Sequence, residues 1–263
     1  MTFGFIGCGN MGGAIARAVC RVSGGEQVIL ANRTMEKARN LAEELGCEAG
    51  ENSQAARCDF VFLGVKPHLM EDMLGEIRNV LAEKRPVLVS MAAGLTMERI
   101  RQMAGGDYPV IRIMPNTPAS VGEGMIQYST LGVSGEQEAE FRKAMAFAGR
   151  LDPLAEPLID AASAVSGCGP AFAAMFLEAL ADGGVACGLP RDKALAYAAQ
   201  MLVGTGRLML ETGMHPGQMK DAVCSPGGST IQGVRTLEQQ GFRGAVTDAV
   251  IAAYEKNKDL GKN

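Results

Sequence analysis

The sequence has 263 residues, of which 47% are hydrophobic and 21% charged, and its formal net charge is −4. This composition is ordinary for a folded globular protein and excludes a mainly disordered chain. Its Lys and Arg residues are scattered singly, so no basic stripe is available to neutralise a phosphate backbone, and we expect no nucleic-acid partner.

The start of the chain shows no sign of an export signal, since the first residues run into a glycine-rich loop without a basic segment or a long apolar run. Later apolar stretches are interrupted by residues such as Glu178 and Asp182 before they reach the roughly 20 residues that span a bilayer. The seven cysteines show no Cys-x-x-Cys spacing, so we expect reduced, space-filling thiols and no metal site. These features predict a cytoplasmic protein with no membrane partner.

From residue 2 to about residue 154, short apolar runs alternate with helical patterns. The runs are predicted strands at residues 3–6, 28–31, 60–65, 87–91 and 110–114. Alternation of strand and helix predicts a parallel sheet, and runs that are apolar on both faces predict helices on both sides of it. Ser134 and Gln137 have the spacing of a capping box, which predicts a helix from there to about Ala148.

After Pro157 the pattern becomes helical. Residues 170–210 are rich in Ala, Leu and Met and are interrupted only at Gly188-Leu189-Pro190. Residues 171–187 are apolar around nearly the whole helix circumference, so this helix must be buried on more than one side. The second half alone is too small to do so, and we predict an intimate dimer. We place the domain boundary near Glu156, between domains at residues 1–156 and 157–263.

The glycine loop at the start of the chain follows a predicted strand and opens a predicted helix. Its Gly-x-Gly-x-x-Gly pattern in this context predicts a dinucleotide site rather than a chance surface loop. Gly7 permits the tight turn, Gly9 lets backbone approach the pyrophosphate, and Gly12 lets helix and strand pack closely. The helix N-terminus then holds the phosphate charge.

The end of the second predicted strand indicates which cofactor is used. An NAD enzyme presents Asp or Glu there to the ribose 2′-hydroxyl, whereas this chain has Asn32-Arg33-Thr34. Arg33 can pair with a 2′-phosphate that a carboxylate would repel, so NADPH is favoured, with NADH as an alternative. Arg33 as a solvated loop residue is the competing interpretation.

Other candidate site residues follow the remaining predicted strands, because ligands bind beyond the carboxyl ends of parallel strands. Small side chains at Ala92, Ala93 and Gly94 would let a nicotinamide ring lie close to backbone. Asn116 and Thr117 would contact the edge of the ring. Two roles fit Lys66, which lies between Val65 and Pro67, equally well: it contacts the cofactor, or it is a charged residue at a strand end in water.

The segment from Cys224 to Thr230 carries a second site. Ser225 before Pro226 signals a helix start. Gly227 and Gly228 leave backbone N–H groups uncovered, which predicts an anion cradle suited to a carboxylate. A plain capped helix is the alternative. A second glycine-rich segment, residues 166–170, precedes the long apolar helix and is expected to allow close backbone approach.

The usual proton donor for ketone reduction is missing. His68 and His215 are the two histidines, and we expect both to be solvated or structural. No lysine lies between Lys143 and Lys193. A carbon–nitrogen double bond removes this need, because its nitrogen can be protonated before hydride arrives, and orientation becomes the main task. With Thr230 holding the ring nitrogen and the cradle holding a carboxylate, a cyclic imino acid is the expected substrate.

The motifs together resemble those of the pyrroline-5-carboxylate reductase family over essentially the whole chain. The resemblance rests on the Gly7–Gly12 loop, Val65-Lys66-Pro67, residues 91–94, 114–118, 166–172 and 225–230, and His215-Pro216-Gly217-Gln218. It implies a Rossmann domain followed by an all-helical dimerisation domain interleaved with that of a partner, in a homodimer that can assemble further. The implied activity is NAD(P)H-dependent reduction of 1-pyrroline-5-carboxylate to L-proline, the last step of proline biosynthesis.

The resemblance also implies individual roles. The residues expected to bind the substrate carboxylate are Ser225, Gly227, Gly228 and Ser229. Thr230 would face the ring nitrogen as the catalytic residue. The residues expected to bind the cofactor are Gly7, Cys8, Gly9, Asn10, Met11, Gly12, Asn32, Arg33, Thr34, Val65, Lys66, Pro67, Ala92, Ala93, Gly94 and Asn116. Cys168 and Ser229 depart from the commonest family pattern, which has serine and threonine there, but neither change removes a backbone donor.

Two other functions share parts of this pattern. A β-hydroxyacid dehydrogenase has the same two-domain plan, but the missing lysine on the first helix of the second half argues against it. A non-catalytic NADPH sensor would not need the cradle.

Overall fold

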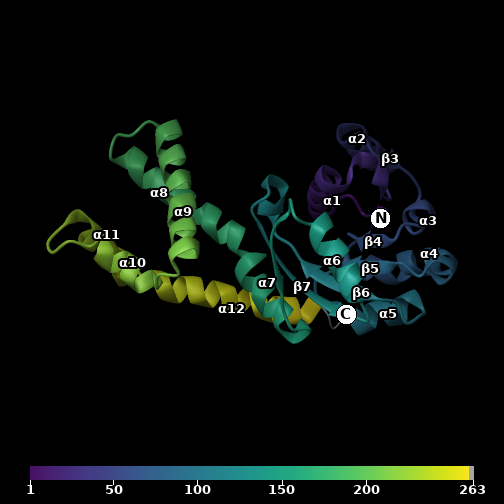
Figure 1. Ribbon diagram of the computed structural model, residues 1–263. Helices are drawn as coiled ribbons and strands as arrows, with labels where there is room; N and C mark the ends of the chain where they lie inside the picture. Colours follow the sequence, from purple (N-terminus) through teal and green to yellow (C-terminus); the bar gives the residue numbers. More distant parts are fainter. Residues whose placement is uncertain (261–263) are drawn as a thin grey trace. The chain divides into compact units, whose positions relative to one another are not determined.

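The computed structural model describes residues 1–260, and the chain divides into two compact units. The first contains residues 1–168 and the described residues from Ala252 onward, and the second contains Gly169–Ile251. The last helix, α12 (Phe242–Leu260), begins in the second unit and ends in the first (Figure 1). Each unit is described separately below.

The first unit is built on an eight-stranded sheet with the order β3-β2-β1-β4-β5-β6-β7-β8. Neighbouring strands from β3 to β6 are parallel, β7 is antiparallel to β6, and β8 is parallel to β7. The strands are β1 (Phe3–Ile6), β2 (Val28–Ala31), β3 (Glu48–Ala49), β4 (Phe60–Leu63), β5 (Val87–Ser90), β6 (Val110–Met114), β7 (Gly124–Leu131) and β8 (Gly149–Pro153).

The predicted parallel sheet is confirmed, with every expected strand in place. β4 and β5 end slightly earlier than expected, at Leu63 and Ser90. The structure adds β3, β7 and β8, which the sequence did not predict.

Helices cover both faces of the sheet and create two separate cores. Ile15 of α1 and Phe141 of α6 belong to one buried cluster with Phe5 of β1, whereas Leu74 of α4 and Ile100 of α5 belong to the other. Alternate residues of the strands point to opposite faces, so β1, β2, β4, β5 and β6 each contribute to both cores. The helices are α1 (Asn10–Ser23), α2 (Met35–Leu45), α3 (Asn52–Ala55), α4 (Met70–Lys84), α5 (Met97–Ala104), α6 (Gly135–Ala144) and α7 (Ile159–Ser166), with 3₁₀ turns η1 (Gly25–Gln27), η2 (Pro67–Leu69), η3 (Thr117–Val121) and η4 (Glu156–Leu158).

The capping box predicted for α6 is confirmed. The Gln137 amide donates to Ser134 Oγ at 3.2 Å, and the Ser134 amide donates to Gln137 Oε1 at 2.9 Å. The predicted end near Ala148 is wrong by about one turn, since the helix stops at Ala144 and residues 145–148 form turns. Met145 and Ala148 remain fully buried, so their apolar character reflects core packing rather than helix continuation.

The second unit is helical, as expected, and consists of α8 (Gly169–Ala186), α9 (Arg191–Thr212), α10 (Pro216–Ala222), α11 (Ser229–Gln239) and the first part of α12. The break between α8 and α9 falls at the predicted place, where Gly188 has a φ of +96°. The buried residues of the second unit are the alanines Ala181, Ala194 and Ala198. Large apolar side chains are exposed instead, including Met175 at 70% and Leu210 at 73%.

One helical stretch, Glu156–Ala186, is long and apolar enough to cross a membrane by length and composition alone. This corrects the expectation that charged residues interrupt every such stretch. A single stretch of this kind is weak evidence for a membrane span, because a helix that is buried in an assembly gives the same signal.

Candidate cofactor and substrate sites

The carboxyl ends of the parallel strands meet at one edge of the sheet, and the strand order changes direction there between β1 and β4. A crevice at such a switch point is where open α/β sheets bind ligands. The loops after β1, β2, β4, β5 and β6 contain the predicted residues Gly7–Gly12, Asn32–Thr34, Val65–Pro67, Ala92–Gly94 and Asn116. The fold therefore places all of the predicted cofactor residues at the same edge.

The glycine loop is tightly packed on its inner side and open on its outer side. Gly7 has a φ of +100°, and a Cβ on Gly12 would lie 2.1 Å from the Gly7 carbonyl oxygen. A Cβ on Gly64, after β4, would lie 2.4 Å from the same oxygen, whereas one on Gly9 would meet no heavy atom within 4 Å. Backbone at Gly9 is therefore open to approach by a ligand.

The helix that follows this loop has free donors at its start. α1 begins at Asn10 with Gly9 as its N-cap, and no side chain caps it. Its first backbone N–H groups therefore lack intrahelical partners and point toward the loop opening, where the helix dipole favours negative charge. These residues fit a pyrophosphate.

Asn32 joins the first two loops. The Cys8 amide donates to Asn32 Oδ1 at 3.1 Å, and Asn32 Nδ2 donates to the Thr34 carbonyl at 3.0 Å. The Cys8 thiol donates to the Ala31 carbonyl at 3.4 Å, and burial raises its pKa to about 12. Cys8 is therefore a neutral packing residue, and Asn32 positions both loops.

A cavity of about 720 Å³ lies along the ends of β1, β2 and β4. Its polar lining includes the predicted residues Asn32, Arg33, Thr34 and Lys66 and also Lys37, which the sequence analysis missed. Lys37 lies in the first turn of α2, and Thr34, the N-cap of that helix, makes no side-chain capping bond. Arg33, Lys37 and an uncapped helix start together provide the charge and donors that a phosphate group requires. Asp72 and Glu76 line the cavity as well.

Asn116 is buried, and its side chain is engaged within the protein. Its Nδ2 donates to the Ser166 carbonyl at 2.9 Å, and its Oδ1 accepts from the Met125 amide at 3.0 Å. Ser166 Oγ also lies 2.9 Å from Gln127 Nε2. Asn116 therefore ties the end of β6 to β7 and to α7, a role that sequence reasoning missed, and its backbone carbonyl accepts from the Ala119 amide at 3.1 Å.

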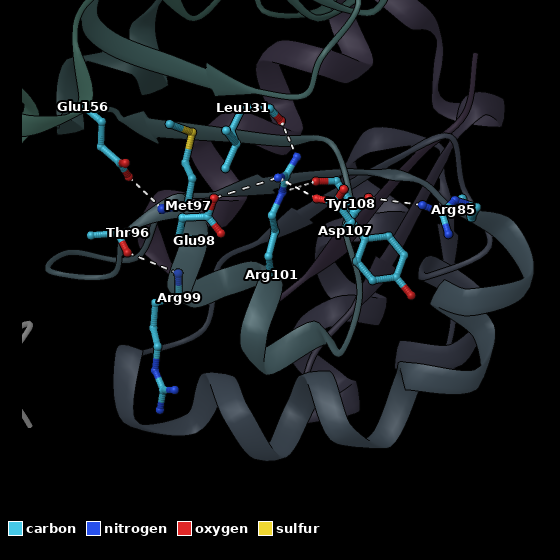
Figure 2. Close-up of polar contacts among 10 residues, drawn as sticks. All are labelled: Arg85, Thr96, Met97, Glu98, Arg99, Arg101, Asp107, Tyr108, Leu131 and Glu156. Carbon is cyan, nitrogen blue, oxygen red and sulfur yellow. Dashed lines mark hydrogen bonds and ion pairs between the residues drawn. The ribbon is translucent and has the colours of Figure 1, made fainter.

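A buried ion pair holds the start of α7 against the sheet. Arg112 of β6 is 2% exposed, and its Nη2 lies 2.6 Å from Asp160 Oδ1 and its Nη1 lies 3.6 Å from Glu156 Oε1. Glu156 also accepts from the Met97 amide at 2.7 Å, which ties it to α5 (Figure 2). In the same view, the guanidinium of Arg101 donates to the carbonyls of Tyr108 and Leu131 and so ties α5 to those residues. This network fixes α7, which ends in the glycine-rich segment at residues 166–170.

The predicted cradle in the second unit, residues 225–230, is a turn that leads into α11. Gly227 has a φ of +71°, and the Gly228 amide donates to the Ser225 carbonyl at 3.0 Å, closing a turn. α11 begins at Ser229 with Gly228 as N-cap and no side-chain capping bond, so its first N–H groups are uncovered. A Cβ on Gly228 would lie 2.3 Å from Ser225 Oγ. Thr230 is exposed beside this opening.

The two histidines have different positions. The Gly217 amide donates to His215 Nδ1 at 3.1 Å, which caps α10 and confirms the structural role expected for His215. His68 is exposed on the lining of the 720 Å³ cavity. Within residues 1–260, no group of three or more His, Cys, Asp or Glu side chains is arranged to hold a metal ion.

Comparison with known proteins decides the family. The chain is 41% identical to pyrroline-5-carboxylate reductase of Escherichia coli K12 over 99% of its own length and 98% of the relative's. It is 39% identical to that of Glycine max over 98% and 96%. The chain belongs to the pyrroline-5-carboxylate reductase family. The resemblance found in the motifs is thereby confirmed, and the chain is an oxidoreductase of that family.

Family models and solved structures agree with this reductase assignment. Residues 156–260 match the model for pyrroline-5-carboxylate reductase dimerisation, and residues 2–94 match that for NADP oxidoreductase, coenzyme F420-dependent. The structure is similar to pyrroline carboxylate reductase of Plasmodium falciparum with NADP bound, with a TM-score of 0.90, 31% identity and coverage of 99% and 98%. For the Coxiella burnetii reductase the TM-score is 0.89 at 30% identity, with coverage of 100% and 99%. The predicted fold class of a Rossmann-like domain with a helical dimerisation domain is confirmed.

Proposed function

We propose that this reductase transfers hydride from NADPH to the carbon–nitrogen double bond of 1-pyrroline-5-carboxylate and so forms L-proline, the last step of proline biosynthesis. The observation that carries the proposal is the uncapped start of α11 behind Ser225–Gly228, in a chain similar over its full length to pyrroline-5-carboxylate reductases. This cradle fits a carboxylate, whereas a dinucleotide site alone would fit any reductase.

We assign the cofactor to the loops at the edge of the sheet. When bound, NADPH supplies the hydride. The open backbone at Gly9 and the uncapped start of α1 would hold the pyrophosphate, and Arg33 and Lys37 would pair with the 2′-phosphate. The small residues Ala92–Gly94 leave room for a flat ring, and Lys66 would contact the phosphates.

The substrate contacts follow from the cradle. Backbone N–H groups at the start of α11, with the hydroxyls of Ser225 and Ser229, would bind the carboxylate. The Thr230 hydroxyl would accept from the protonated ring nitrogen and fix the orientation of the imine. Because an iminium carbon is already electrophilic, orientation of this kind replaces the general acid that a ketone would require.

We also propose that two copies form a homodimer through the helical domain, which exposes most of its large apolar side chains in a single chain. The matched dimerisation model supports this, and such dimers would be able to assemble further. The functional boundary is proposed near Glu156, with residues 157–263 serving substrate binding and dimerisation. Residues 261–263 of that range lie outside the described part of the chain. We assign the enzyme to the cytoplasm, without membrane or nucleic-acid partners.

One assay with a matched pair of variants tests the activity. Oxidation of NADPH is followed with 1-pyrroline-5-carboxylate and, separately, with a β-keto acid. Removing the hydroxyl in Thr230→Ala should lower kcat about 100-fold, as for loss of one transition-state donor or acceptor, with the Kd for NADPH unchanged. Thr236→Ala, two turns along α11, removes a hydroxyl that bonds the Gln232 carbonyl and should leave kcat within about twofold, as expected for a change outside the reacting site.

The outcomes separate the competing functions. Turnover of the β-keto acid alone would make the protein a β-hydroxyacid dehydrogenase. Tight NADPH binding without turnover of either compound would make it a cofactor sensor. Equal loss of kcat in both variants would remove the special role of Thr230.

A further inference from the structure

Two cysteines that are distant in the sequence meet between α1 and α2. Cys20 lies near the end of α1, Cys47 lies just beyond the end of α2, and their thiols are close enough for each to shift the pKa of the other. Both are partly buried against the same core cluster, and both are free thiols in this structure. The pair is invisible to a search for short cysteine motifs because the two residues are brought together only by the fold.

The backbone around the pair is closely packed. A Cβ on Gly25 would lie 2.2 Å from the Gly46 carbonyl oxygen, so the segments that follow the two helices touch backbone to backbone. Gly46 has a φ of +64° and ends α2, and the Cys47 amide donates to the Ala42 carbonyl at 3.0 Å. These contacts hold the two thiols near each other.

The two thiols are not equivalent. The contact between the two thiols lowers the pKa of Cys47 and raises that of Cys20. Cys8 and Cys58 differ from them, because burial raises the pKa of each thiol, to about 12 and about 11. Thiolate is the nucleophilic form of cysteine, so Cys47 is the more reactive member of the pair.

A cavity of about 330 Å³ gives small molecules access to Cys20, and Cys47 is itself partly exposed. Cys20 lines it together with Arg17, Arg21 and Phe147. A small peroxide can therefore reach a thiol here that is partly exposed and has a second thiol beside it, which is the arrangement found at reversible oxidation sites.

We propose that Cys20 and Cys47 form a redox site that a peroxide converts to an intramolecular disulfide between α1 and α2. The Cys47 thiolate attacks one peroxide oxygen, the O–O bond breaks, and Cys47 becomes a sulfenic acid while one water leaves. The Cys20 sulfur then attacks the Cys47 sulfur, the S–O bond breaks, and a second water leaves. Two thiols and one hydrogen peroxide thus give one disulfide and two waters, and a dithiol reductant reverses the reaction.

The test treats the reduced, full-length enzyme with hydrogen peroxide, alkylates the remaining thiols and maps the peptides by mass spectrometry. The expected product is one linked pair of peptides carrying Cys20 and Cys47, lighter by two hydrogens and restored by dithiothreitol. Cys187→Ser, which removes an exposed cysteine on the second unit, should form the same link. Cys20→Ser should form none and should carry oxidised Cys47 instead.

Two results would overturn the proposal. One is that Cys20 and Cys47 are both recovered as alkylated thiols after Cys187 has been oxidised. The other is that Cys47 is converted to sulfinic acid in the wild-type enzyme without any linked peptide, because this would show that Cys20 does not reach it.

Discussion

The two compact units of this reductase bury their apolar residues in different ways. The first unit encloses one apolar cluster on each face of its sheet, with Phe5 on one side and Leu74 on the other. The second unit buries three alanines and exposes large side chains such as Met175 and Leu210 along its helices. Both units are rich in apolar residues, so amino-acid composition does not distinguish one unit from the other.

The difference shows where each unit obtains its stability. Close packing within the chain stabilises the first unit, because burial of apolar surface is the dominant favourable contribution to folding. The second unit gains little from its own chain, and the proposed homodimer would bury its apolar surface against another copy. On this proposal, the apolar pattern of the second unit reports burial in the assembled protein rather than in one chain.

The largest effect is expected from a change in the packed glycine loop of the first unit. Gly12→Ala would place a Cβ 2.1 Å from the Gly7 carbonyl oxygen, so helix and loop must separate. We expect the Kd for NADPH to rise by at least about 1,000-fold, because misplacement of the donors that hold a phosphate removes several kcal/mol of binding. Titration of NADPH by fluorescence measures the change.

The adjacent residue provides a matched control. A Cβ on Gly13 would lie 3.4 Å from Arg17 Nη1 and 3.5 Å from a Leu41 methyl group, and both of these are ends of flexible side chains. Gly13→Ala should therefore bind NADPH as wild type does. If Gly12→Ala also kept wild-type affinity, close packing would not govern this site.

The next effect tests whether the second unit depends on another copy. Leu210→Asp should weaken dimer association about 100-fold, because burial of a leucine contributes about 1.5–3 kcal/mol and 1.4 kcal/mol is a tenfold change. Val121→Asp is the matched control, since Val121 in η3 of the first unit is exposed to the same 73% as Leu210. Sedimentation equilibrium over a range of concentrations measures both. Equal dimer affinity for both variants would mean that exposure in the second unit does not mark an interface.

The strands β1, β2, β4, β5 and β6 could be predicted from the sequence, whereas the interior strand β7 and the edge strands β3 and β8 could not. β1 and β4 are buried along their whole length and appear as continuous apolar runs. β8 is at the edge of the sheet, with half-exposed residues and two exposed ones, and β3 has two residues. Neither leaves a pattern that differs from a loop.

The candidate site could be predicted where backbone geometry requires glycine. Gly7 and Gly227 both have positive φ, and their spacing to the following helix is local in sequence. The bond from Asn116 to Ser166 spans 50 residues and that from Arg112 to Asp160 spans 48. Such contacts depend on which strands and helices become neighbours, so a single sequence cannot reveal them.

A smaller effect is expected at the surface of the cofactor cavity in the first unit. Arg33→Ala should raise the KM for NADPH about tenfold and leave that for NADH unchanged, because an exposed charge-assisted bond to a phosphate contributes about 1.5 kcal/mol. Arg39→Ala, on the exposed side of helix α2, which begins two residues after Arg33, should change neither. A matching rise for both cofactors would show that Arg33 does not contact the 2′-phosphate.

The last effect appears only at alkaline pH and concerns the buried thiol in the first unit. Burial raises the pKa of Cys8 from 9.0 to about 12. Between these values the unfolded chain loses a proton that the folded chain retains, so the free energy of unfolding falls as the pH rises, by up to about 1.4 kcal/mol per pH unit. Below pH 9 the contribution is constant.

Cys8→Ala should therefore show a shallower loss of stability than wild type when urea unfolding is measured from about pH 8 to about pH 11. Cys187→Ala, which removes an exposed thiol of the second unit, is the control and should keep the wild-type slope. If both variants showed the wild-type slope, burial in the first unit would not hold the Cys8 thiol in its neutral form.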